Sequence, residues 1–324
     1  MRYKHFILSI KTILLIIAFV SCSSVQKKNA KTDITASVSG GAVIPFSYCK
    51  TYLPVFTVTD SSGIKLCLAF DSGFTYCALN KNGLKKATGS SKKLLENAID
   101  YCKQQNPDIG DNLIKRNAAA MVKQGRMGIT VYELHADKFS AGNTVFHYEP
   151  ETAAYDSVDG IVGFSFFGDC KNITIDYLHS VIYIDSNTLS GTILPMEKEP
   201  IGLYATKITI NGREQTALID TGAQEFIVRR GYNTDIPELT GVQKQNFIYD
   251  GKQHVGVSLP VYKTVTVKYG GVERKVHAYR SDNILIHASV YGKRTGCVYN
   301  LFGWPFFKGR CIQFDFENKK FVIG

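Results

Sequence analysis

An aspartate in the same short pattern occurs twice in this chain, and this repetition constrains the fold more than any other feature. Residues 65–73 read KLCLAFDSG and residues 216–223 read TALIDTGA, so each apolar run ends in Asp-(Ser/Thr)-Gly. Apolar runs of this length and composition are typical of buried strands. A lone carboxylate there is costly to bury unless it has a partner. We therefore expect Asp71 and Asp220 to lie together, each as the partner of the other.

The two patterns belong to a longer internal repeat. Strand-like segments precede each aspartate, at residues 52–59 and 201–210. An apolar-apolar-Gly motif with two further strand-like segments follows each aspartate, within residues 159–184 and 299–323. A chain of 324 residues is long enough for two domains, and its 18 Tyr and 19 Phe favour strands over helices. We predict a mostly β protein with two related lobes, residues 46–190 and 195–324.

Between these shared ends the two copies differ. Residues 91–105 have the spacing of an amphipathic helix, and the second copy has no counterpart. Polar turns centred on Gly125 and Gly251 occur in both copies, and strand-like segments follow them. Hairpin turns are predicted at Gly142-Asn143 and Gly270-Gly271.

The N-terminus has the features of an export signal. Basic residues flank a short apolar stretch, residues 13–20, which is too short to span a bilayer as a helix. The stretch ends at Ser21-Cys22, which resembles a bacterial lipobox; the alternative is an ordinary signal peptide with an incidental cysteine. We expect a lipoprotein signal peptide over residues 1–21, lipidation of Cys22, a polar tether over residues 22–45, and anchoring in the cell envelope at the outer membrane.

Charge and cysteine content limit the other possibilities. The formal net charge of +10 is scattered, and no basic segment is interleaved with aromatic residues, so nucleic-acid binding is not expected. No Cys or His spacing is typical of a zinc site. Two cysteine pairs flank motifs of the repeat, Cys67 with Cys77 and Cys297 with Cys311. These cysteines are either local disulfides, which an exported chain can form, or buried thiols.

Together these motifs resemble aspartic proteases of the pepsin and retroviral type. The resemblance is carried by Asp-Ser-Gly and Asp-Thr-Gly-Ala, each with its downstream Gly motif and a Phe-Phe/Ile-x-Asp-Tyr/Phe tail, and it covers residues 46–324. It implies closed β-barrel lobes, with Asp71 and Asp220 meeting in one active site of a monomer. It also implies that a peptide or protein is the substrate and that neither a cofactor nor a metal is needed.

The resemblance assigns supporting roles to further residues. Hydroxyls at Ser72 and Thr221 are expected to form a hydrogen-bond lattice under the two aspartates. The remaining assignments are close turns at Gly73, Gly222 and Ala223, strands passing the aspartate loops at Gly163 and Gly303, and flaps over the substrate at Gly125, Tyr249 and Gly251.

The expected chemistry follows from the pair of carboxyl groups. Two carboxylates about 3 Å apart share one proton, so the charged one acts as a base on water and the protonated one polarises the peptide carbonyl. Phe74 stands where the family keeps a small residue, and such a ring could narrow the cleft. The alternative function is therefore a lipid-anchored peptide-binding protein on a protease scaffold, with little or no turnover.

Overall fold

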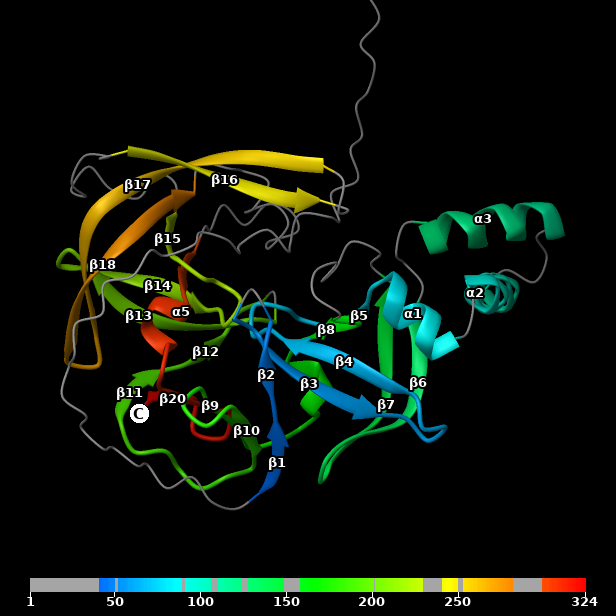
Figure 1. Cartoon of the computed structure of the whole chain (residues 1–324), viewed down its shortest axis with the longest axis horizontal. Helices are drawn as coiled ribbons and strands as arrows, with labels where there is room; N and C mark the ends of the chain where they lie inside the picture. Colours follow the sequence, from blue (N-terminus) through cyan, green and yellow to red (C-terminus); the bar gives the residue numbers. More distant parts are fainter. Residues whose placement is uncertain are drawn as a thin grey trace, which may run out of the picture.

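The computed structural model describes most of the chain after its first 40 residues. The described residues are 41–49, 52–88, 91–105, 110–123, 128–148, 158–200, 202–229, 241–249, 253–281 and 299–324. Figure 1 shows a β-rich body with two lobes side by side and a group of helices at one end.

The first lobe is a closed barrel of six strands. In sheet order these are β3 (Pro54–Thr59), β4 (Lys65–Phe70), β8 (Gly160–Val162), β5 (Cys77–Leu79), β7 (Phe139–Tyr148) and β6 (Gly128–Ala136). A pairing between Thr59 and His135 joins β3 to β6 and closes the ring. The short strand β2 (Ser47–Tyr48) extends the sheet beyond β3. Alternation in β3 buries Phe56 and Val58 inside the barrel, as expected for a strand with one face in the core.

The second lobe repeats this barrel. In sheet order its strands are β13 (Tyr204–Ile210), β14 (Arg213–Ile219), β19 (Asn300–Phe302), β15 (Phe226–Arg229), β18 (Val272–Ser281) and β17 (Gln253–Tyr269). Pairing of Thr209 with Lys268 closes the ring between β13 and β17. Strands β12 (Glu197–Lys198) and β16 (Gly241–Tyr249) extend the sheet at its two ends. The prediction of a mostly β protein with two related barrel lobes is therefore confirmed.

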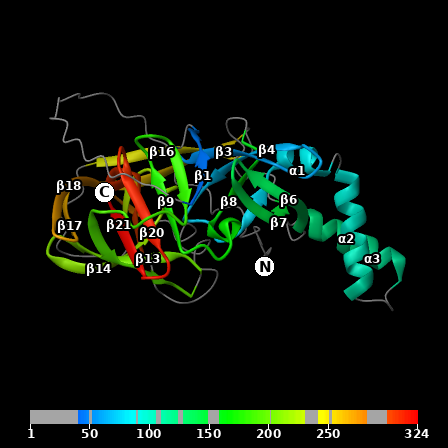
Figure 2. The same cartoon turned by 90° about the horizontal axis from the view of Figure 1, so that it is seen from below.

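A third sheet joins the two halves of the chain. Its six strands, in order, are β1 (Ala42–Pro45), β10 (Val181–Ile184), β9 (Asn172–Asp176), β20 (Cys311–Asp315), β21 (Lys320–Ile323) and β11 (Thr192–Pro195). The halves meet where β9 pairs with β20, with Ile175 opposite Ile312 (Figure 2). Each half supplies three strands, so this sheet belongs to neither lobe alone.

Helices are few, and most of them lie in the first half. The predicted helix at residues 91–105 is confirmed as α2 (Ser91–Gln105), which buries Leu94, Ala98 and Cys102 along one face. Two helices were not predicted, α1 (Lys81–Thr88) and α3 (Asp111–Lys123), and the three together form the end of the molecule beyond the first barrel (Figure 1).

Some boundaries and turns differ from the sequence-based predictions. The predicted tether, residues 22–45, extends too far, because β1 pairs with β10 and buries Ile44. The turn predicted at Gly142-Asn143 is wrong. Gly142 lies within β7 at an irregularity opposite Leu134, and the hairpin turns at Asp137-Lys138 instead. The turn at Gly270-Gly271 is confirmed between β17 and β18.

The cysteines that the structure describes near the first aspartate are thiols. Cys67 and Cys77 form no disulfide, so the disulfide alternative is wrong for this pair. Instead, Cys77 Sγ lies 3.7 Å from Ser165 Oγ, and burial raises the pKa of Cys77 to about 11. Cys311 is also a thiol, and its predicted partner Cys297 lies outside the described residues.

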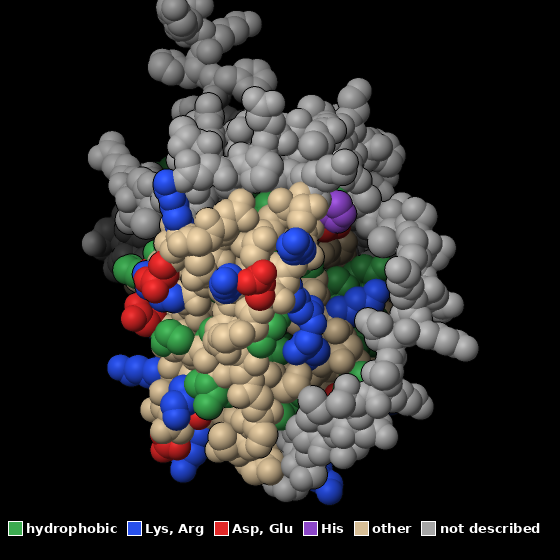
Figure 3. Space-filling view, turned by 90° about the vertical axis from the view of Figure 1, so that its left-hand side faces the viewer, with side chains coloured by type: hydrophobic (Ala, Val, Ile, Leu, Met, Phe, Trp, Pro, Cys, Tyr) green, Lys and Arg blue, Asp and Glu red, His purple; other side chains and the backbone are tan. Residues whose placement is uncertain are grey.

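Two further features concern the surface. Figure 3 shows that on the face of the second lobe Lys and Arg side chains are spread out and interleaved with Asp and Glu. Within the described part of the chain, every helix is too short or too polar to cross a bilayer.

Candidate active site

The two barrels place Asp71 and Asp220 in equivalent positions. Each follows the second strand of its barrel, β4 or β14, and that strand pairs in parallel with the strand of the downstream Gly motif, β8 or β19. The backbone N–H of Asp71 donates to the Val162 carbonyl at 3.0 Å, and the N–H of Asp220 donates to the Phe302 carbonyl at 3.0 Å. Matching strand pairs therefore hold both aspartates at the ends of buried strands.

Backbone N–H groups of the two turns donate to the carboxylates. Gly73 N–H donates to Asp71 Oδ1 at 2.7 Å, and Gly222 N–H donates to Asp220 Oδ1 at 2.9 Å. One bond also joins the two turns, because Gly222 N–H donates to Asp71 Oδ1 at 3.2 Å. The N–H of Ala223 adds a bond to Asp220 Oδ1 at 3.1 Å. Each carboxyl group is thus fixed by the loop that carries it, and Asp71 also by the loop opposite.

Glycine is required in both turns because each carboxyl group packs against the opposite backbone. A Cβ atom on Gly73 would lie 2.6 Å from Asp220 Oδ1, and one on Gly222 would overlap with the carboxylate of Asp71. These contacts come from opposite halves of the chain. The predicted meeting of Asp71 and Asp220 is present in the structure, where their carboxyl groups share a hydrogen bond.

Beneath the carboxyl groups, the hydroxyls of Ser72 and Thr221 form the expected lattice. Ser72 N–H donates to Thr221 Oγ1 at 2.8 Å, and Thr221 N–H donates to Ser72 Oγ at 2.8 Å. Ser72 Oγ–H in turn donates to the Ile219 carbonyl at 2.8 Å. Both hydroxyl residues are buried, so these bonds tie the two loops together where water cannot compete.

Burial raises the pKa of both aspartates, but unequally. Desolvation raises the pKa of Asp71, while N–H bonds from Gly73 and Gly222 and the hydrogen bond with Asp220 favour its charged form. Desolvation and the neighbouring charge of Asp71 raise the pKa of Asp220 well above its ordinary value. The two groups titrate as one pair, and because desolvation and their neighbouring charges oppose a second ionisation, the pair holds one proton more tightly than two separate aspartates would.

Gly163 and Gly303 lie where the downstream strands pass the aspartate loops. Gly163 N–H donates to the Tyr76 carbonyl at 3.0 Å, and a Cβ on Gly163 would overlap with the Phe74 carbonyl. A Cβ on Gly303 would overlap with the Ala223 carbonyl and come within 2.7 Å of the Asp220 carbonyl. The close passage predicted for both glycines is therefore present, and a side chain would push the strand away from the loop.

The ring of Phe74 packs into the first lobe. Phe74 is buried in a small apolar cluster, with its ring centroid 4.4 Å from that of Tyr76.

In the second lobe, two polar residues follow Ala223. Gln224 has a buried side-chain nitrogen without a hydrogen-bond partner among the described residues, and burial raises the pKa of Glu225 to about 7.

Sequence reasoning missed Tyr177, Gln224 and Glu225 as neighbours of the aspartate loops. Tyr177 is buried, its hydroxyl lacks a hydrogen-bond partner within the described chain, and the charges of Asp71 and Asp220 contribute to its raised pKa. Desolvation is the largest cause of that shift. Only the repeat position of Gln224 and Glu225, directly after the Asp-Thr-Gly-Ala motif, could have drawn attention to them.

The remaining predicted residues lie at or beyond the edge of the described chain. Cys22, Gly125 and Gly251 are outside the described residues, and Tyr249 is described only as the last residue of β16. Strands β16 and β17 form a hairpin around residues 250–252, as expected of a flap in the second lobe. In the first lobe the described element before residues 124–127 is helix α3 rather than a strand, and strand β6 begins after them.

Among the described residues, no group of three or more His, Cys, Asp or Glu side chains is placed to hold a metal ion. Neither a scan of protein-family models nor a search of curated proteins finds a significant match to this chain.

Proposed function

We propose that the protein is an aspartic endopeptidase of the pepsin and retroviral type, with Asp71 and Asp220 as its catalytic pair. One observation carries the proposal: two partly buried carboxyl groups from equivalent loops share a hydrogen bond above a crossed hydroxyl lattice. A purely structural role would leave two mutually repelling acids buried at the junction of the lobes, which is costly. A shared proton gives the pair a chemical use.

In the proposed reaction, Asp71 is charged and Asp220 carries the proton. Asp71 takes a proton from a water molecule bound between the two groups, and the resulting oxygen nucleophile attacks the carbonyl carbon of the peptide bond. Asp220 polarises the carbonyl oxygen by donating its hydrogen bond and transfers its proton to it. The tetrahedral intermediate then breaks at the C–N bond: the amine leaves with the proton that Asp71 accepted, and one hydroxyl of the intermediate returns a proton to Asp220 as the new carboxyl group forms.

The proposed substrate is an extended segment of peptide or protein, bound in one site between the lobes of a monomer. An extended chain can form backbone hydrogen bonds with strand edges, while side chains fill pockets on either side. The β16–β17 hairpin belongs to the second lobe and lies along one side of the molecule (Figure 1). We propose that this hairpin is the flap that covers the bound peptide.

Loss of either carboxylate should remove peptide cleavage. We expect Asp71→Asn and Asp220→Asn each to lower kcat by at least about a thousandfold, and the double variant to be scarcely slower, because residues acting as one unit are not additive. Activity should follow a bell in pH. Its two limbs should follow the two apparent pKa values of the pair, and the alkaline limb should lie above the ordinary range for Asp because the charge of the first carboxylate opposes ionisation of the second. A peptide-library digest from acid to neutral pH measures both effects.

Near wild-type cleavage by either single variant would contradict the aspartic mechanism. A carboxylate outside the site provides the matched control: Asp60→Asn, in the turn between β3 and β4, should leave kcat unchanged. Melting curves of all variants show whether a loss of activity reflects unfolding.

A second candidate function is peptide binding without turnover, and one observation favours it. In the first lobe a helix, α3, rather than a strand leads to the predicted flap. A site covered from one lobe only could bind a peptide yet admit too much water for efficient cleavage. Tight peptide binding by the wild-type protein, with no cleavage at any pH, would support this function over the protease.

We also propose that the protein is a lipoprotein of the cell envelope, anchored at the outer membrane through Cys22. Replacing Cys22 with Ala removes the thiol that would carry the lipid. We expect the variant to lose incorporation of a labelled fatty acid and to leave the detergent-soluble membrane fraction. Cys102→Ala, which alters a buried thiol of α2, is the matched control. Unchanged labelling of the Cys22 variant would refute the anchor.

A further inference from the structure

We propose that a cavity beside Gly202 binds a planar aromatic ring that carries a carboxylate. The cavity has a volume of about 730 Å³ and lies between residues of the two halves of the chain. Its walls include Thr75 and Phe164 from the first half and Lys198, Gly202 and Tyr204 from the second. Neither Asp71 nor Asp220 lines it, so this inference does not depend on peptide cleavage.

The repeat identifies Gly202 as the counterpart of Tyr52. In the first half, Tyr52 N–H donates to the Cys49 carbonyl at 2.9 Å, and Cys49 N–H donates to the Leu53 carbonyl at 3.3 Å. In the second half, the same two bonds join Gly202 to Glu199 at 2.8 Å and Glu199 to Leu203 at 2.8 Å. Both central residues have left-handed backbones, with φ of 61° at Tyr52 and 87° at Gly202. The two turns are therefore equivalent, but only one carries a side chain.

The side chain of Tyr52 has a defined partner. Its ring stacks on Trp304, with centroids 5.1 Å apart and planes 8° from parallel. Trp304 follows Gly303, and Phe164 follows Gly163, so Phe164 is the counterpart of Trp304. An aromatic side chain at position 202 would therefore stack on Phe164, but Gly202 has no side chain. The cavity that Phe164 and Gly202 both line corresponds to this missing ring.

The walls of the cavity are suited to an aromatic ligand. Phe164 packs against Tyr204 and Phe316 in edge-to-face geometry, with centroid distances of 5.2 and 5.3 Å. Tyr204 and Phe316 are 5.1 Å apart. Rings grouped in this way favour a further ring that is stacked or edge-on, beyond the effect of apolar area alone. The partner of Phe164 would thus be supplied by a ligand rather than by the protein.

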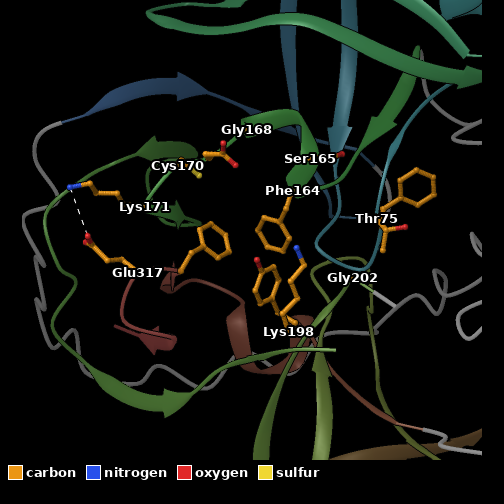
Figure 4. Close-up of a pocket in the computed structure, with 13 residues that line it drawn as sticks. Thr75, Phe164, Ser165, Gly168, Cys170, Lys171, Lys198, Gly202 and Glu317 are labelled. Carbon is orange, nitrogen blue, oxygen red and sulfur yellow. Dashed lines mark ion pairs between the residues drawn. The ribbon is translucent and has the colours of Figure 1, made fainter. Parts of the chain in front are cut away.

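At a neighbouring position of the same turn, the second half has a lysine where the first half has a tyrosine. Tyr48 pairs with Pro54 in the first half, and Lys198 pairs with Tyr204 in the second, so Lys198 is the counterpart of Tyr48. Lys198 Nζ lies 5.8 Å from the centroid of Tyr204, and Figure 4 shows it pointing toward the ring of Phe164. An ammonium group beside a ring slot favours a ligand with an anionic group next to its ring.

The other charged groups of the cavity do not cancel this preference. Lys171 and Glu317 pair with each other at 4.0 Å on the edge of the cavity, as the dashed line in Figure 4 shows. Asp169 lies between Gly168 and Cys170, which are on the side away from Lys198 (Figure 4). The carboxylate of a ligand would therefore face Lys198 while its ring stacks on Phe164.

Two sources could supply this chemistry: a free aryl carboxylic acid, or the C-terminal residue of a peptide that ends in Tyr, Phe or Trp. The test uses the full-length protein in detergent and titration calorimetry with 3-(4-hydroxyphenyl)propionate. Its neutral amide should bind about fivefold more weakly, because it lacks the charge next to Lys198. A cyclohexyl analogue should also bind several-fold more weakly. Tighter binding of the peptide Ala-Ala-Ala-Tyr than of the free acid would identify the peptide as the source, and weaker binding the free acid.

Filling the slot provides the decisive variant. Gly202→Tyr places a ring where Tyr52 has one, and the new Cβ would meet Thr75 at an ordinary 3.5 Å. We expect at least a tenfold loss of affinity for the aryl acid. Gly212→Tyr is the matched control, because Gly212 also has positive φ, at 86°, and a Cβ there meets nothing within 4 Å. A folded Gly202→Tyr variant with unchanged affinity would overturn the proposal.

Two further measurements do not depend on how Gly202→Tyr folds. Lys198→Gln should weaken binding of the acid about fivefold and leave binding of the amide unchanged, whereas the exposed control Lys207→Gln should change neither. In the wild-type protein, the aryl acid should shift the amide NMR signals of Gly202 and Thr75 but not that of Tyr52. Absence of saturable binding at low-millimolar concentration, or shifts confined to other residues, would also overturn the proposal.

Discussion

Asp71, Asp220 and Glu225 carry carboxyl groups whose pKa values all lie above the ordinary range because these groups are buried. For the two aspartates, N–H donors and the shared proton offset part of the cost of burial. Glu225 differs, because desolvation is the only cause of its shift. It is therefore the residue at which the protein should respond most simply to pH.

Glu225 should destabilise the folded protein as the pH rises. Because its folded pKa of about 7 lies above the ordinary 4.5, the folded state binds this proton more tightly than the unfolded state does. Its contribution to stability is complete below pH 4.5 and is lost as the pH rises through about 7. We expect Glu225→Gln to raise the free energy of unfolding at pH 8 by about 1–3 kcal/mol and to change it little at pH 4.5. Denaturant unfolding at both pH values measures this.

An exposed glutamate in the same lobe serves as the control for Glu225. Glu214→Gln, on β14, should give the same small change at both pH values. An equal effect of Glu225→Gln at pH 4.5 and pH 8 would show that the side chain acts through packing rather than through its charge.

Elements of the two lobes are held together by close backbone passages rather than by large side chains. Gly163 shows this most clearly, because it follows β8 and crosses the loop of Asp71 against the Phe74 carbonyl. The equivalent passage in the second lobe uses Gly303. At these points the strand and the aspartate loop fix each other's position.

A methyl group at Gly163 should separate the strand from the loop. We expect Gly163→Ala to lower the free energy of unfolding by at least about 3 kcal/mol, because the new Cβ would overlap with a backbone carbonyl that has no room to move. Thermal unfolding measures the loss. Gly110→Ala is the control, since a Cβ there meets nothing within 4 Å and its φ is not positive. Equal melting temperatures for the two variants would contradict the proposed crossing.

At the scale of the whole molecule, the six-stranded sheet makes the two halves one unit. Its central pairing joins β9 to β20, and a buried polar group adds to it: Gln313 donates to Thr174 Oγ1 at 2.8 Å and to the Asn187 carbonyl at 2.9 Å. The same sheet binds the chain's first described strand, β1, at its edge. The predicted boundary at residue 46 therefore separates β1 from the sheet in which it is paired.

Removal of β1 should weaken the whole molecule. A chain that starts at residue 46 loses the pairing with β10 and the burial of Ile44, whereas a chain that starts at residue 41 keeps both. We expect the shorter chain to lose about 2–4 kcal/mol of stability and several degrees in Tm. Calorimetry of the two chains compares them directly. Equal Tm values would show that β1 contributes nothing to the folded body.

Much of this protein follows from local sequence. The Asp-(Ser/Thr)-Gly turns, the strands that lead into them and the downstream Gly motifs could be predicted because apolar runs, small residues and turn signals act over a few residues. Their repetition also predicted that Asp71 and Asp220 meet, since two buried charges need each other. Helix α2 was predictable from its periodicity. Helix α3 is patterned as clearly as α2 and was overlooked, whereas α1 is short and offers only Leu84 and Ala87 as apolar positions.

Tertiary structure decided what depends on residues distant in the chain. Pairing of β9 with β20 and the place of β1 in the shared sheet required knowing which strand edges meet. The shifted pKa values of Asp71 and Asp220 depend on each other, because each carboxyl group is the neighbour of the other across the two loops. The cavity beside Gly202 is likewise absent from local sequence, because it exists only where two halves pack and one of them lacks a ring. Local patterns specify the strands and turns, but partners, burial and empty space are set by packing between distant segments.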